Sequence, residues 1–144
     1  MRRLLFRYRP LQTVLLAGLL LIPVGCSKTD RPPIGTVTGM VYLDGQPLDG
    51  AIVFFSPDDR GRVSECMTKK DGSYDLVYIG KTHGAKVGKH HVSITTAYEG
   101  VDTETGKTIV KKEVVPRKYN GGSSELVVDV KPGRNVHDFK LESK

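Results

Sequence analysis

Apolar and polar residues alternate along most of the chain after residue 36, and this period of two predicts β-strands. Val37, Val41 and Leu43 alternate with outward positions, and Asp44-Gly45 then gives a hairpin turn signal. The same pattern, with turns at short spacing, predicts further strands at 51–55, 64–68, 73–78, 92–97, 126–130 and 136–141. No stretch has a 3.6-residue period with helix caps. We therefore expect an all-β fold, a Greek-key β-sandwich of about seven strands.

The first 25 residues differ from the rest of the chain in charge and hydropathy. Four arginines form a basic head within residues 2–9, and residues 10–25 carry no charge. This segment ends in Gly25-Cys26, which resembles the lipobox of bacterial lipoproteins, where the cysteine becomes diacylated and forms the new N-terminus. The resemblance implies a signal peptide at 1–25 and a lipid on Cys26. The alternative is an ordinary secretory signal with an incidental cysteine.

The segment that follows the expected lipid resembles a tether. Before it, the strongly apolar stretch 14–24 is shorter than the roughly 20 residues that a membrane-spanning helix needs, so the first segment is not expected to cross a membrane as a helix. Residues 26–35 are mostly polar and include two adjacent prolines, as linkers often do. The lipoprotein resemblance implies export and attachment to the membrane through Cys26. Ser27, in place of an Asp retention signal, implies the outer membrane, facing the periplasm or the surface. Residues 36–144 then form one domain.

The charge of the chain is concentrated in its first segment. The whole sequence has 22 Lys and Arg against 16 Asp and Glu, a net charge of +6. Without the four arginines of the head, 18 basic residues face 16 acidic ones, so the remainder is only slightly basic. This balance excludes the nucleic-acid partner that a strongly basic protein would suggest. Cys66 is the one cysteine besides Cys26, so no intrachain disulfide framework is expected.

Three segments of the domain carry a family resemblance. They read VTGMVYLDGQPLDGAIVFF from Val37, TKKDGSYDL from Thr68 and GKHHVSI from Gly88. Together they resemble the carboxypeptidase regulatory-like domain, a transthyretin-like (prealbumin-like) β-sandwich. Lys69 replaces the Asp usual in that family, and His90 replaces an aromatic residue. The matching motifs are turns and core positions, so the resemblance implies a fold and leaves the chemistry open.

Enzymes of this fold have residue patterns that this chain lacks. Hydroxyisourate hydrolase uses a C-terminal Tyr-Arg-Gly-Ser motif, whereas residues 139–144 read FKLESK. Intradiol dioxygenases hold iron with two histidines separated by one residue. His90 and His91 are adjacent, so on a regular strand they point to opposite faces. We therefore predict that the chain is not an enzyme and has no cofactor.

One set of residues is compatible with a metal site. His90 is in phase with the apolar positions of its strand, and so is His137. With Cys66 they would supply the N,N,S ligands that zinc and copper accept. The alternative, which we favour, is that both are core histidines satisfied by hydrogen bonds, and we predict no metal ligand. We interpret Asp71 as a turn residue and His83 as a surface residue.

The sequence therefore predicts a lipid-anchored lipoprotein of the cell envelope whose β-sandwich is a non-catalytic binding or structural module. Its partners would be the membrane, through Cys26, and an envelope protein or glycan. The alternatives are a small transthyretin-like hydrolase and a carbohydrate-binding module. The chain has no Trp, so a glycan would have to stack on Tyr42, Tyr98 or Tyr119.

Overall fold

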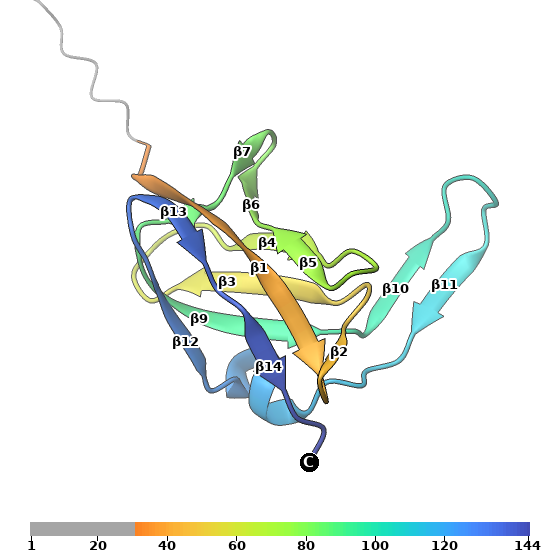
Figure 1. The fold of residues 1–144 in the computed structure, drawn as a ribbon. Coiled ribbons are helices and arrows are strands. Elements are labelled where there is room, and N and C mark those ends of the chain that lie inside the picture. Colours follow the sequence, from red (N-terminus) through yellow and green to blue (C-terminus); the bar gives the residue numbers. More distant parts are fainter. Residues whose placement is uncertain (1–30) are drawn as a thin grey trace, which may run out of the picture. The chain divides into compact units, whose positions relative to one another are not determined.

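The computed structural model describes residues 31–144, which fold into two packed β-sheets with a projecting hairpin (Figure 1). Cys26, the expected signal peptide and the start of the expected tether lie outside the described residues. The all-β sandwich predicted from the alternation is confirmed. Within the described part of the chain, no helix has the length and hydropathy that crossing a membrane requires.

The first sheet is built around β1 (Ile34–Leu43), the longest strand of the domain. Its neighbours run parallel to it along one side and antiparallel along the other. The parallel strands are β13 (Gly133–Val136) and β14 (Phe139–Leu141), and the antiparallel ones are β2 (Gln46–Pro47), β5 (Ser73–Asp75) and β8 (Ala85–Lys86). The last strands of the chain therefore lie beside its first, a pairing that no local sequence signal predicts.

The second sheet is antiparallel throughout. Its strands, in spatial order, are β12 (Leu126–Val130), β9 (Gly88–Thr95), β3 (Ile52–Pro57), β4 (Ser64–Met67), β6 (Val77–Ile79) and β7 (Thr82–His83). β3 lies between β9 and β4, the central position that its apolar run predicts. Its outer face remains partly open, because Ile52 and Phe54 are only half-buried.

The core lies between the two sheets and consists of the inward positions that the alternation predicts. Fully buried side chains from β1 meet fully buried side chains from β3 and β9; they are Val37, Val41, Val53, Phe55, Val92 and Ile94. Phe139 and Tyr74 extend this cluster with stacked rings 6.2 Å apart. Burying a large aliphatic or aromatic side chain contributes about 1.5–3 kcal/mol relative to exposure. This cluster therefore supplies much of the driving force that holds the sheets together.

Two features were not predicted from the sequence. The strands β10 (Tyr98–Val101) and β11 (Thr108–Lys111) pair only with each other and project from the sandwich (Figure 1). Two short 3-10 helices, η1 (Arg117–Tyr119) and η2 (Gly121–Ser123), cross the end of β9. Every residue of β11 is exposed, so this strand lacks the one-sided apolar pattern by which strands are recognised.

Candidate functional site

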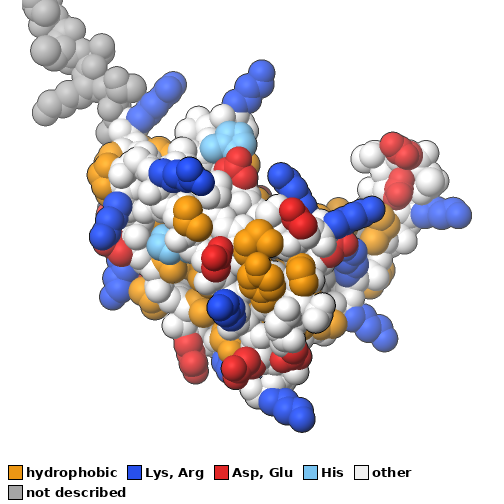
Figure 2. All heavy atoms as spheres, viewed as in Figure 1, with side chains coloured by type: hydrophobic (Ala, Val, Ile, Leu, Met, Phe, Trp, Pro, Cys, Tyr) orange, Lys and Arg blue, Asp and Glu red, His pale blue; other side chains and the backbone are white. Residues whose placement is uncertain are grey.

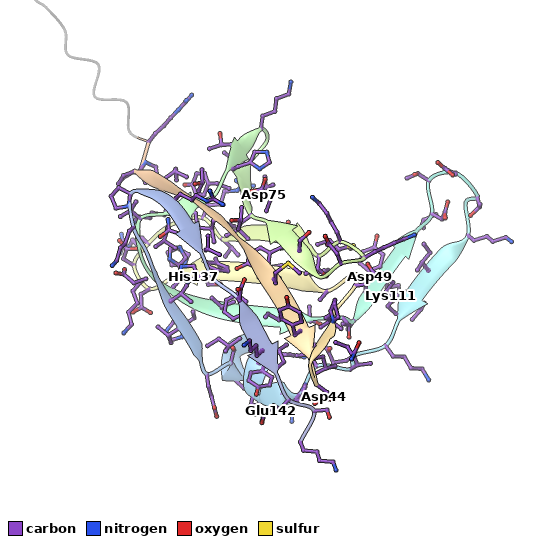
Figure 3. The ribbon with its side chains drawn as sticks, viewed as in Figure 1. Asp44, Asp49, Asp75, Lys111, His137 and Glu142 are labelled. Atoms are coloured by element: carbon purple, nitrogen blue, oxygen red, sulfur yellow. The ribbon has the colours of Figure 1, made fainter. Side chains whose placement is uncertain are left out.

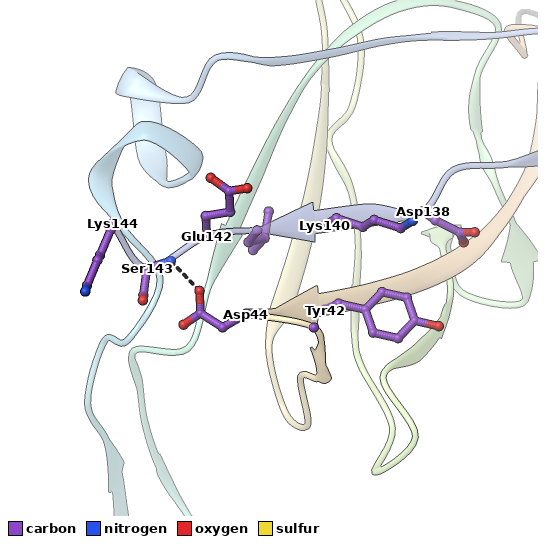
Figure 4. Close-up of a pocket in the computed structure, with 9 residues that line it drawn as sticks. Tyr42, Asp44, Asp138, Lys140, Glu142, Ser143 and Lys144 are labelled. Atoms are coloured by element: carbon purple, nitrogen blue, oxygen red, sulfur yellow. Dashed lines mark hydrogen bonds between the residues drawn. The ribbon is translucent and has the colours of Figure 1, made fainter.

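An open groove of about 1060 Å³ lies where β1 and β14 end (Figure 4). Aromatic and charged side chains line it together: Tyr42, Asp44, Asp138, Lys140, Glu142 and Lys144. Asp44 and Glu142 lie at the same end of the domain, away from His137 (Figure 3). The face on which β1 and β14 lie carries hydrophobic side chains surrounded by acidic and basic ones (Figure 2).

The strand register places Tyr42 beside a charged side chain. Tyr42 pairs with Lys140 of β14 on one side and with Pro47 of β2 on the other. Val41 and Phe139 are buried, so the next residue of each strand points outward. The side chains of Tyr42 and Lys140 therefore share the outer face of the first sheet.

The turn after β1 fixes one end of the groove. Asp44 and Gly45 both have positive φ, at 49° and 79°, as a two-residue type I′ hairpin turn requires. The backbone N–H of Ser143 donates to Asp44 Oδ1 at 2.9 Å, and the N–H of Asp44 donates to the Leu141 carbonyl (Figure 4). The hydrogen bonds from Ser143 lower the pKa of Asp44. The carboxylate is thus held as an anion that secures the chain end against the turn.

Asp138 occupies the gap between β13 and β14. Its Oδ1 accepts a hydrogen bond from the Met40 N–H at 2.9 Å, which replaces a ladder bond. The backbone of β1 can lie this close to His137 because residue 39 is a glycine. A Cβ at Gly39 would collide with the carbonyl oxygen of His137. Within residues 31–144, no hydrogen bond or ion pair engages the side chains of Lys140 or Glu142. The groove therefore offers free donors and acceptors beside an aromatic ring.

The three tyrosines that could stack on a glycan do not lie together on one surface. Tyr42 lines the groove, whereas Tyr98 lies on the projecting hairpin, where its hydroxyl covers Gly100. Tyr119 packs against the core from η1, and Lys118 Nζ lies 5.0 Å from its ring centre. Tyr42 is therefore the one of the three that combines an aromatic ring with a charged groove. Sequence reasoning did not identify Asp138, Lys140 and Glu142, although they alternate with the buried Phe139 and Leu141.

The structure places both candidate core histidines against the same ring. The ring centres of His90 and His137 lie 5.9 and 6.3 Å from that of Phe55. His90 is fully buried, as predicted, and His137 is half-buried. His90 Nδ1 lies 2.9 Å from the Gly88 carbonyl oxygen, but the Nε2 atoms of both histidines are buried without a hydrogen-bond partner in the described structure. We expected hydrogen bonds to satisfy both histidines, and this expectation is met only in part. Burial lowers the pKa of both His90 and His137.

Cys66 does not join these histidines in a metal site. Among residues 31–144, no three His, Cys, Asp or Glu side chains are grouped so that they could hold a metal ion. Cys66 is half-buried, and desolvation raises the pKa of its thiol to about 12, so it is protonated at neutral pH. His83 is exposed and pairs with Asp75 at 2.8 Å. Asp71 accepts bonds from the N–H and hydroxyl of Ser73, as a turn residue does.

Comparisons with known proteins assign this chain to no family. No protein-family model and no curated protein matches the sequence. Among solved structures, a protein from Pseudomonas aeruginosa described as a putative carbohydrate binding protein is similar at a TM-score of 0.44 and 16% identity, over 80% of this chain and 92% of that one. The dioxygenase domain of a dioxygenase carbohydrate-binding protein fusion from Streptomyces sp. SirexAA-E is similar at 0.36 and 18% identity, over 81% and 84%.

A 9R-lipoxygenase from Cyanothece is also similar, at a TM-score of 0.38 and 12% identity. The match covers 81% of this chain, which spans 18% of the lipoxygenase. This lipoxygenase and the dioxygenase domain are named as enzymes, which contradicts the prediction that this chain is not one. The prediction failed because it compared the sequence with two enzyme types only. Similarity at this level assigns neither activity to the present chain.

Proposed function

We propose that the domain is a carbohydrate-binding module of the cell envelope, held at a membrane by lipid on Cys26, and that Tyr42 is the centre of its binding site. The observation that carries this proposal is the position of the Tyr42 ring beside unengaged charged side chains in a groove of about 1060 Å³.

Sugar rings have an apolar face and a rim of hydroxyl groups, and the groove offers a partner for each. The apolar face of a sugar stacks on an aromatic ring such as Tyr42. Its hydroxyls donate to carboxylates such as Glu142 and accept from an ammonium such as Lys140. Specific small-molecule sites commonly combine apolar surface with a few placed polar groups in this way.

The expected anchor limits where such a glycan can lie. The stretch 27–33 separates Cys26 from the first residue of β1. Cys26 and Ile34 are eight residue steps apart, so at about 3.3–3.6 Å per residue this stretch reaches at most about 29 Å. Tyr42 lies near the other end of β1, so a lipid on Cys26 would restrict the groove to glycans within roughly 55 Å of the membrane surface, such as a cell-wall polymer, and would raise their effective concentration.

The proposed binding site is tested with two variants of Tyr42 and one control. Wild-type protein should co-sediment with insoluble cell-wall polysaccharide, and Tyr42→Ala should weaken this binding at least about tenfold, because about 1.4 kcal/mol of stacking is lost. Tyr42→Phe keeps the ring and should bind within a few-fold of wild type. Tyr98→Ala removes an exposed tyrosine outside the groove and serves as the matched control. Equal binding by wild type and Tyr42→Ala, or no binding to any glycan, would overturn the proposal.

The proposed anchor is tested separately with Cys26→Ala. Lipidated protein should enter the detergent phase in Triton X-114 partitioning, whereas the variant should remain in the aqueous phase, because its acyl chains are missing. Equal partitioning of the two proteins would refute the lipid anchor and leave the Tyr42 site untouched.

A further inference from the structure

A second groove, of about 710 Å³, lies on the outer face of the other sheet, across β9, β3 and β4. Phe54 contributes its ring to this groove, and Val63 and the backbone of Gly121 and Gly122 border it. Phe55 is fully buried in the core, so Phe54, the residue before it, points away from the core. This groove and the Tyr42 groove therefore belong to opposite faces of the sandwich.

The register of the strands places a carboxylate beside the Phe54 ring. Phe54 pairs with Glu65 of β4 on one side and with Ser93 of β9 on the other. Directly opposite residues on neighbouring strands have Cβ atoms about 4.5–5.5 Å apart. Within the described part of the chain, Glu65 takes part in no ion pair and accepts no side-chain hydrogen bond. Its negative charge is therefore unneutralised next to an aromatic ring.

Glu65 also occupies the junction between two hollows. It lines the Phe54 groove and an adjoining hollow of about 560 Å³ bordered by Arg62 and Tyr78. Among residues 31–144, Arg62 is the one Lys or Arg side chain that lines either hollow, and it forms no ion pair with Glu65. A ligand lying across this face would have Glu65 at its centre.

The other end of the groove is lined by His91 and by serine side chains. His91 lines the groove, and its Nε2 lies 2.8 Å from Asp58 Oδ1. Ser56 lies directly opposite His91 on β3. Ser93 is already engaged, because its Oγ accepts the Gly121 N–H at 2.8 Å. Of the described residues, Glu65 is thus the one carboxylate that lines this groove.

We infer that the Phe54–Glu65 groove binds a primary ammonium group, as carried by an amino sugar or a lysine side chain. A carboxylate forms charge-assisted hydrogen bonds with an ammonium ion, and the face of an aromatic ring attracts the same cation. A neutral N-acetylated sugar satisfies neither contact. This site is separate from the Tyr42 groove and does not depend on the function proposed for it.

The experiment uses detergent-solubilised full-length protein and isothermal titration calorimetry with four probes. The probes are glucosamine, N-acetylglucosamine, Nα-acetyl-lysine amide and Nα-acetyl-norleucine amide, which form two pairs that differ in the ammonium group. We expect an amine to bind at least about tenfold more tightly than its neutral partner. Binding by the sugar amine alone or by the lysine amide alone would identify the source of the ammonium group. Failure of both amines to bind, or equal binding of amine and neutral partner, would overturn the inference.

Three variants locate the site. Glu65→Gln keeps the shape and removes the charge, and should weaken amine binding about tenfold. Arg62→Ala removes the basic side chain of the adjoining hollow and should strengthen amine binding. Tyr98→Ala removes an aromatic ring that lines neither groove and should leave amine binding unchanged. An unaltered affinity in Glu65→Gln, with unfolding curves that match those of wild type, would refute the assignment.

Discussion

The carboxylate of Glu113 joins the chain after β11 to the end of β9, and Glu113→Gln should expose how much this junction stabilises the domain. Glu113 accepts hydrogen bonds from the hydroxyl of Thr95, from the N–H and hydroxyl of Thr96 at 3.0 and 2.9 Å, and from the Val115 N–H at 2.9 Å. Asn120 Nδ2 donates a further bond at 2.7 Å. A Gln side chain keeps one acceptor oxygen and loses the negative charge.

The size of the effect follows from the pKa of Glu113. Partial desolvation raises this pKa, but the hydrogen bonds from Thr95, Thr96 and Val115 outweigh it and lower the pKa from 4.5 to about 2. Lowering this pKa from 4.5 to about 2 corresponds to roughly 3 kcal/mol before screening by solvent. Glu113 is exposed, so solvent screening reduces this figure, and we expect about 1.5–2 kcal/mol. Because the folded-state pKa is depressed, this stability is present above about pH 4.5 and is lost as the pH falls towards 2.

The assay is urea unfolding of wild type and Glu113→Gln at several pH values between 7 and 2. The variant should be less stable by about 1.5–2 kcal/mol at pH 7, and the two free energies of unfolding should largely converge by pH 2, where about half of the folded wild type carries a protonated Glu113. Glu99→Gln, an exposed change on β10, should alter stability by less than about 0.5 kcal/mol. A difference between wild type and Glu113→Gln that stays constant from pH 7 to pH 2 would refute the reasoning.

Three further predictions concern the core. Burial lowers the pKa of His90 and His137, so the unfolded chain takes up protons before the folded one, and the melting temperature should fall as the pH drops below about 6.5. His90→Phe should be neutral or stabilising at pH 7 and should lose less stability at pH 5; an equal loss in both proteins would contradict this. The Cys66 thiol, whose pKa burial raises to about 12, should react with iodoacetamide only after unfolding, and rapid labelling of native protein would show an accessible thiolate. Tyr74→Phe removes the bond from the hydroxyl to the His137 carbonyl at 2.7 Å and should cost about 1 kcal/mol in thermal unfolding; an unchanged melting temperature would mean that this bond contributes nothing.

The alternation of apolar and polar residues predicted the strands, because successive side chains of a strand point to opposite sides of a sheet and one side is buried. Val37 and Val41 face the core from β1, and the Asp44-Gly45 pair forms its turn with positive φ at both residues. The β10–β11 hairpin escaped prediction because β11 has no buried side and so no period-two signal. The parallel pairing of β1 with β13 and β14 joins residues about a hundred positions apart, and the alternation within a strand does not specify its neighbour.

The prediction of the candidate sites was limited in the same way, because the alternation within a strand does not specify which residues lie beside it. Tyr42 could be chosen from the sequence as an outward aromatic, but its neighbour Lys140 follows from long-range register alone. The phase of His90 correctly predicted a fully buried side chain. The phase of His137 predicted an inward position, but it could not predict the packing against Phe55 or that the Nε2 atoms of both histidines lack partners in the described structure. The Phe54–Glu65 pair was missed because the alternation within each strand does not specify the register that places Glu65 opposite Phe54.

The central position of β1 has a mechanical consequence. The expected tether enters this strand at Ile34, and Tyr42 lies near its other end, about 26 Å away at 3.3 Å per residue. Tension between a membrane-bound lipid and a glycan held at Tyr42 would therefore run along β1 itself. The ladder bonds to β5 and β13 lie across this direction, so they would be loaded in shear and would have to break together. Under load, the domain would resist extension where it is most extensively paired.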